Sequence, residues 1–169
     1  VPREAGPRLM GRAEDVALLR RAIGVSAEAR ASGNTPFGAL LASPDGEVLL
    51  EQGNIEITER TCTGHAETTL MARASGLFTK AELAQTTLYT SAEPCAMCAG
   101  SIYWGGVGRV VYALSEKELL TLTGADEQNP TLDLPCREVF ARGQKAIEVV
   151  GPFPELAALA ASVHEGYWG

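Results

Sequence analysis

The stretch Glu93-Pro94-Cys95-Ala96-Met97-Cys98 carries two cysteines three positions apart, and the tripeptide His65-Ala66-Glu67 lies earlier in the chain. At the start of a helix, this spacing places both cysteine sulfurs on one face, where they can bind the same metal ion. A histidine from another helix makes a third ligand, and three protein ligands leave the fourth position of a zinc ion open. The sequence therefore predicts a catalytic zinc centre formed by these two cysteines and His65, with Glu67 as the acid/base for a metal-bound water.

Both halves of this motif are predicted to lie at helix N-termini, directly after loops. A helix N-terminus carries a partial positive charge, which lowers the pKa of a thiol and favours the thiolate that binds zinc. Pro94 fits at or just before the first helical turn, where its missing N–H costs nothing. His65 and Glu67 are two positions apart, which is about 200° around an ideal helix. We therefore expect His65 at the entry of its helix, where both side chains can face one site.

A C-x-x-C motif alone is ambiguous, because redox dithiols, halves of zinc ribbons and core cysteines also use it. A redox pair needs no histidine partner, and a zinc ribbon needs a second C-x-x-C, which the sequence lacks. A closed structural zinc site has no open position for water, so it would give Glu67 no acid/base role. The combined motif therefore favours a catalytic metal site over these alternatives.

The composition is that of an ordinary globular protein, with 46% hydrophobic and 21% charged residues. The length favours one domain over residues 1–169, with a loose N-terminal arm over residues 1–12. No run approaches the roughly 18 apolar residues of a membrane span, and no basic and apolar leader is seen, so we expect a cytoplasmic protein without a membrane partner. The net charge of −7 makes a nucleic-acid partner unlikely, because such a surface repels phosphates.

Hydrophobic periodicity and turn residues predict alternating helices and strands. The turn Ser43-Pro44-Asp45-Gly46 joins the first two strands as a hairpin. This order predicts an α/β fold with one five-stranded mixed sheet sandwiched by helices. The expected helices span residues 13–30, 65–74, 95–104, 114–122, 134–141 and 155–164, and the expected strands span 37–42, 47–52, 86–90, 109–113 and 146–150.

The sequence resembles the cytidine deaminase-like superfamily, whose zinc-dependent nucleobase deaminases share the signature H-x-E followed by P-C-x-x-C. Residues 89–104, which read Y-T-S-A-E-P-C-A-M-C-A-G-S-I-Y-W, are similar to the core block of bacterial guanine deaminases. Pro36-Phe37-Gly38-Ala39 and Gly53-Asn54 match the first hairpin of the same family. The resemblance covers about residues 35–113, and it does not extend to the stretches 61–64 and 131–138.

This resemblance implies a three-layer cytidine deaminase-like fold, a Zn²⁺ cofactor, a homodimer and hydrolytic deamination of a small nucleobase or nucleoside, with guanine first. The alternatives are a tRNA adenosine deaminase, a cytosine or nucleoside deaminase, and a non-catalytic binding module with the same fold. Glu67 argues against the binding module, and the acidic net charge argues against the tRNA enzyme.

The resemblance also implies roles for residues outside the metal motif. Asn54 and the backbone N–H of Ala66 are expected to bind the base, although Asn54 also fits a simple turn residue at the end of a strand. Phe37 and Trp104 are candidates for the pocket wall or for the core. Tyr167 and Trp168 form a candidate lid, with anchoring of the last helix as the alternative.

Five further residues have minor or structural roles in this interpretation. Asp126 or Glu127 is a candidate second proton carrier by the same resemblance, and a solvated loop is the simpler interpretation. We expect Cys62 to be a bystander of the metal site. Cys136 and His164 are interpreted as structural.

Overall fold

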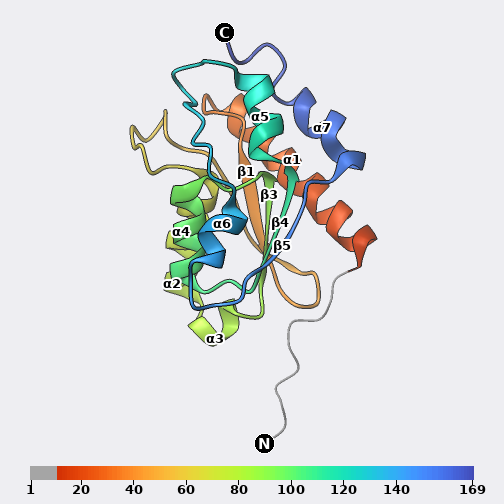
Figure 1. The fold of residues 1–169 in the computed structure, drawn as a ribbon, viewed down its shortest axis with the longest axis vertical. Coiled ribbons are helices and arrows are strands. Elements are labelled where there is room, and N and C mark those ends of the chain that lie inside the picture. The colour runs from red at the N-terminus through yellow and green to blue at the C-terminus, as the bar shows by residue number, and fades with distance from the viewer. Residues whose placement is uncertain (1–10) are drawn as a thin grey trace, which may run out of the picture.

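The computed structural model describes residues 11–169 and contains alternating helices and strands (Figure 1). Residues 1–10 of the predicted arm lie outside the described residues, whereas Gly11 caps the first helix and Arg12 begins it. None of the helices in residues 11–169 is long and apolar enough to cross a lipid bilayer. In chain order the elements are α1 (Arg12–Ala31), β1 (Gly38–Ala42), β2 (Val48–Gly53), α2 (Ala66–Leu77), α3 (Lys80–Leu83), β3 (Thr87–Ala92), α4 (Ala96–Gly105), β4 (Arg109–Leu114), α5 (Glu116–Thr123), α6 (Cys136–Ala141), β5 (Glu148–Val150), a 3₁₀ turn (Pro154–Leu156) and α7 (Ala157–Ser162).

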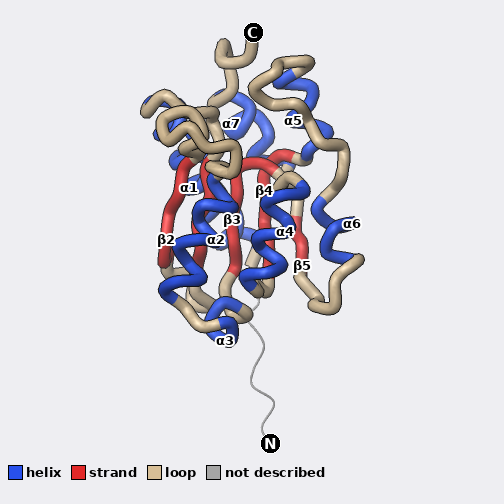
Figure 2. The backbone as a smooth tube through the Cα atoms, turned by 90° about the vertical axis from the view of Figure 1, so that its left-hand side faces the viewer, coloured by secondary structure: helices blue, strands red, loops and turns tan. Residues whose placement is uncertain are grey.

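The strands form one mixed sheet in the order β2-β1-β3-β4-β5. Strand β1 is antiparallel to both β2 and β3, whereas β3, β4 and β5 run parallel. Helices α2, α4 and α6 cover one face of the sheet, and α1 and α7 cover the other (Figures 1 and 2). The predicted three-layer α/β fold with a five-stranded mixed sheet is confirmed.

The two faces of the sheet contribute to two separate hydrophobic clusters, because successive strand residues point to opposite sides. Leu88 and Val110 pack on the side of α2 and α4. Their chain neighbours Tyr89 and Val111 pack on the side of α1 and α7. The central strands β1, β3 and β4 are buried along their whole length, as expected for strands covered on both faces.

The topology brings several strand termini and helix N-termini together at one end of the sheet. The register pairs Gly38, at the start of β1, with Gly53, at the end of β2. It also pairs Ala39 with Thr90, close to the end of β3. Helices α2 and α4 begin at this same end (Figure 2). Residues just outside these strand ends therefore surround one space, which is where ligands bind in open α/β sheets.

The sequence-based elements differ from the observed ones mainly in short segments. Helix α3 was not predicted, although Thr79 caps it by accepting a hydrogen bond from the backbone N–H of Glu82. The expected helix over residues 155–164 is a 3₁₀ turn beginning at Pro154 followed by the shorter α7. These segments hold three to six residues each, too few for helical periodicity to be read.

A buried ion pair ties α1 to the sheet. Arg109 of β4 donates hydrogen bonds of 2.8 Å and 2.7 Å to the two carboxylate oxygens of Asp15 in α1. Tyr89 of β3 donates a 2.6 Å hydrogen bond to the same carboxylate. Such a bidentate pair is stable in a protein interior only while both partners are present. Asp15 therefore fixes the position of α1 on β3 and β4.

Replacing Asp15 with alanine should lower the free energy of unfolding by about 3–5 kcal/mol, because the buried Arg109 guanidinium keeps only the half-exposed carboxylate of Glu148, 3.4 Å from its Nε, as a counter-charge. The matched control is Arg21→Ala, which removes an exposed ion pair with Glu51 and should change stability by less than about 1 kcal/mol. Urea titration of both variants measures the difference. Equal stabilities of the two variants would contradict this account of the buried pair.

Candidate active site

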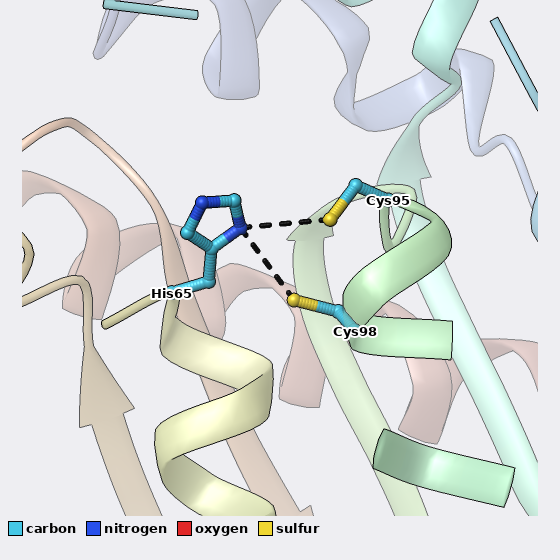
Figure 3. Close-up of side chains that lie close together, drawn as sticks. All are labelled: His65, Cys95 and Cys98. Atoms are coloured by element: carbon cyan, nitrogen blue, oxygen red, sulfur yellow. Dashed lines mark hydrogen bonds between the residues drawn. The ribbon is translucent and has the colours of Figure 1, made fainter. Parts of the chain in front are cut away.

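The three predicted metal ligands lie close together at the end of the sheet described above (Figure 3). The Nδ1 atom of His65 lies 3.5 Å from the sulfur of Cys95 and 3.6 Å from that of Cys98. Tetrahedral zinc with Zn–S of about 2.3 Å and Zn–N of about 2.0–2.1 Å separates its nitrogen and sulfur ligands by about 3.6 Å. The two sulfurs and one imidazole nitrogen therefore fit a zinc ion as they stand.

Helix entry positions two of these ligands. His65 is the N-cap of α2 and Cys95 is the N-cap of α4, both with extended backbone. Cys98 lies in the first turn of α4, so its sulfur returns to the same side as that of Cys95. Because His65 precedes the helical turn, its side chain faces the site together with Glu67, which lies inside α2. The helix-entry position expected for His65 is the one observed.

Charge interactions favour a thiolate at this site. The hydrogen bond from Cys98 lowers the pKa of Cys95 to about 4, and His65 contributes in the same direction. The hydrogen bond with Cys95 raises the pKa of His65 to about 9. Burial raises the pKa of Glu67 to about 7, reinforced by the Cys95 charge. A carboxyl group with a pKa near neutrality can both accept and release a proton during a reaction.

A small pocket opens beside the ligands. Four glutamates line the pocket, and its lining contains no lysine or arginine. The lining residues are Phe37, Asn54, Glu56, His65, Glu67, Ala92, Glu93, Cys95, Glu116, Leu119 and Asn129.

Glu116 is a pocket residue that sequence reasoning missed. It begins α5 directly after β4, and burial raises the pKa of its carboxyl to about 8. This carboxyl makes no hydrogen bond with any residue in the described part of the chain, 11–169. The signal in the sequence was the capped helix start after a strand, at Ser115, but it did not indicate where the next side chain points.

Glu93 holds Glu116 in this position. One carboxylate oxygen of Glu93 accepts a 3.0 Å hydrogen bond from the backbone N–H of Glu116. The other oxygen accepts a 2.8 Å hydrogen bond from the backbone N–H of Cys136 at the start of α6. The Glu93 carboxylate is thus fully occupied and links α5 and α6 to the metal loop.

Three predicted base-binding residues lie at the pocket or directly behind it. Asn54 lines the pocket, and its amide also exchanges hydrogen bonds of 3.0 Å and 3.2 Å with Glu56. Phe37 lines the pocket as well. Ala66 is buried in the core between His65 and Glu67, and its N–H belongs to the first turn of α2, where donors lack helical acceptors. The roles of these residues in binding stay predictions.

The prediction that Trp104 lines the pocket is wrong for this chain. Its side chain is 74% exposed at the far end of α4, against the ring of Tyr103. Helix α4 begins at the metal site, and nine residues of helical rise carry Trp104 about 13 Å away from Cys95 along the axis. Trp104 instead borders a shallow surface groove between α2 and α4.

The C-terminal aromatic residues pack behind the pocket wall. The indole N–H of Trp168 donates a 2.9 Å hydrogen bond to Nδ1 of His164. Phe37 contacts both of these rings, at centroid distances of 6.1 Å and 5.5 Å. The Tyr167 hydroxyl donates to Gln128. The tail therefore supports Phe37 in this structure, and closure of the pocket by Tyr167 and Trp168 stays a prediction.

The remaining candidates do not line the pocket. Asp126 accepts hydrogen bonds from the backbone N–H groups of Gln128 and Gly169, and Glu127 lies on a surface hollow. Asn129 of the same loop lines the pocket instead, and its amide nitrogen has no hydrogen-bond partner within residues 11–169. Cys62 is exposed and Cys136 is buried, both outside the ligand cluster.

The purified protein should bind about one zinc ion per chain, because only one open site of this kind is formed by the described residues. Replacing Cys95 with alanine should remove the metal. The matched control is Cys62→Ala, which deletes an exposed thiol and should leave zinc content unchanged. Elemental analysis after dialysis measures this, and full zinc occupancy in Cys95→Ala would overturn the ligand assignment.

Comparison with known proteins agrees with this geometry. A Schizosaccharomyces pombe protein named probable cytosine deaminase is 41% identical over 92% of this chain and 93% of its own length. The guanine deaminase of Bacillus subtilis is 38% identical over 57% of this chain and 62% of its own length. The structure of a guanine deaminase from Nitrosomonas europaea superimposes with a TM-score of 0.75 and 24% identity, covering 95% of this chain and 87% of that one.

The family described as the cytidine and deoxycytidylate deaminase zinc-binding region matches residues 12–114. This match spans more than half of the chain and includes all three metal ligands and Glu67. The chain belongs to the cytidine deaminase-like family of zinc-dependent hydrolytic deaminases.

Proposed function

We propose that this protein hydrolyses the exocyclic amine of a free, unphosphorylated nucleobase. The observation that carries the proposal is the Glu67 carboxyl, buried in a small acidic pocket beside the three metal ligands. A buried carboxyl with a pKa of about 7 next to a metal site is suited to moving protons between water and a bound base.

Bound Zn²⁺ would be held by His65, Cys95 and Cys98, and it supplies the Lewis acidity that lets water attack at neutral pH. Glu67 accepts a proton from the attacking water and delivers it to the ring nitrogen next to the amine-bearing carbon. Glu67 then carries the second proton to the departing amine. A C–O bond forms, the C–N bond breaks, and ammonia leaves a base that now bears a carbonyl group.

The charge of the pocket supports a free base over a nucleotide or a tRNA. Glu56, Glu67, Glu93 and Glu116 line it without any compensating lysine or arginine. A phosphate group brought to this pocket would lose its hydration without gaining a lysine or arginine partner from the pocket lining. The net charge of −7 also disfavours tRNA, because it repels the phosphate backbone over longer distances.

Two bases have specific support. The block over residues 89–104 favours guanine, as the sequence predicted. Similarity to the Schizosaccharomyces pombe protein favours cytosine, because it extends over 92% of the chain and so beyond the metal motifs. Guanine offers a ring N–H beside its amine-bearing carbon, and cytosine offers the amine itself. The Glu116 carboxyl in the pocket wall is a candidate hydrogen-bond partner for either group.

Ammonia release from zinc-loaded protein, measured across bases, nucleosides and nucleoside monophosphates, tests the substrate class. We expect kcat/KM for guanine or cytosine to exceed that for the corresponding monophosphate by at least roughly 10²-fold, since the pocket lining offers the phosphate no lysine or arginine. Preference for a monophosphate, conversion of adenosine to inosine in tRNA, or no turnover of any free base would each overturn the proposal.

Glu67→Gln should retain zinc and lose at least roughly 10²-fold in kcat, because the amide keeps the shape of the side chain but cannot shuttle protons. Glu56→Gln is the matched control, since Glu56 lines the same pocket with a carboxylate already bound to Thr35 and Asn54. Steady-state kinetics on the best substrate compare the two variants. Wild-type kcat in zinc-loaded Glu67→Gln would show that another group moves the protons.

A further inference from the structure

The two cysteine ligands have different surroundings. Cys95 lies at the pocket wall and is partly exposed, whereas Cys98 is completely buried. A buried thiolate cannot be hydrated, so its negative charge depends on donors supplied by the protein. Besides the His65 ring and Cys95, the Cys98 sulfur contacts the Glu67 carboxyl and the hydroxyl of Thr68, which lies at 3.2 Å. An ionised carboxylate cannot donate a hydrogen bond to a thiolate, whereas the Thr68 hydroxyl can.

The direction of this hydrogen bond follows from counting hydroxyl protons. Ser101 donates its proton to the backbone carbonyl of Cys98 at 2.8 Å. The hydroxyl of Thr68 lies 3.3 Å from that of Ser101 and 3.2 Å from the Cys98 sulfur. Because the Ser101 proton is already used, the proton between these groups comes from Thr68. A thiolate is the stronger of the two acceptors, since hydrogen bonds to charged groups are the stronger ones.

The position of Thr68 in α2 directs its hydroxyl towards the Cys98 sulfur in α4. Thr68 directly follows Glu67 in α2, and its side chain faces α4, which carries Cys98 and Ser101. Helix α2 therefore contributes to the metal centre three times, through a ligand at its N-cap, the acid/base in its first turn and a hydroxyl beside the second thiolate. The hydroxyl links the two helices at the point where both contact the metal site.

We propose that Thr68 is a positioning residue of the metal centre, whose hydroxyl holds the Cys98 thiolate in place by a hydrogen bond. Partners of this kind fix the orientation of a ligand and draw electron density from it, and their loss typically costs 10–100-fold in metal affinity or activity. Cys98 is then the fixed ligand of the pair, and Cys95 is the ligand that faces the substrate. The inference rests on the metal centre and is independent of which base the enzyme deaminates.

The test compares Thr68→Val with Thr68→Ser. Valine replaces the hydroxyl with a methyl group of similar size, whereas serine retains the hydroxyl. Zinc affinity is measured by competition with a chromogenic chelator at fixed pH, and the sulfur-to-metal charge-transfer band is recorded for the Co²⁺-substituted proteins. We expect Thr68→Val to bind zinc about 10–100-fold more weakly and to shift the band to lower energy, because the sulfur electrons lose their stabilising donor.

Thr68→Ser should keep both the zinc affinity and the band of the wild type. Ser101→Ala should change zinc affinity by no more than about threefold, because the hydrogen bond from Thr68 to the sulfur remains. Thr68→Ala provides a second variant without the hydroxyl if valine impairs folding, as judged by circular dichroism. Wild-type affinity and an unmoved band in a folded variant that lacks the hydroxyl would overturn the proposal. These readouts need no substrate, so failure to find a deaminated base would leave this result standing.

Discussion

The arrangement of one imidazole nitrogen and two sulfurs at the starts of α2 and α4 is the constraint on which the rest of the site depends. Two helix entries must lie side by side for these atoms to approach within 3.6 Å. The mixed sheet provides this, because β3 leads directly into α4 while the start of β1 and the end of β2 lie at the same end of the sheet. The pocket is the space that these connections leave above this end of the sheet.

Three buried glutamates beside the metal ligands illustrate how surroundings decide the role of a side chain. Glu93 has both carboxylate oxygens occupied by backbone N–H groups, so it acts as a structural link. Glu67 is buried next to the ligands with a pKa of about 7, which suits proton transfer. The Glu116 carboxyl has no hydrogen-bond partner in the described part of the protein and is therefore available to a bound molecule.

The sequence was sufficient to predict the sheet and the metal centre, and physical reasons explain why. Alternation and turn residues locate strands, and ligands three apart at a helix start form a local geometry that needs no knowledge of the fold. Glu116 was not predictable, because its contact with the site depends on where β4 ends relative to β3. Trp104 was misplaced since a family block preserves residue types along a helix, but the helix axis carries its last turn away from the site.

Zinc X-ray absorption spectroscopy of the metal-loaded protein tests the central claim most directly, because it reports the ligand atoms without reference to a substrate. The account predicts two sulfur ligands at about 2.3 Å and two lighter ligands at about 2.0–2.1 Å, one of them an imidazole nitrogen. The second lighter ligand marks the open position at which the reaction would take place. A shell of three or four sulfurs, or one without imidazole scattering, would contradict the assignment of His65, Cys95 and Cys98 as the ligands of an open catalytic site.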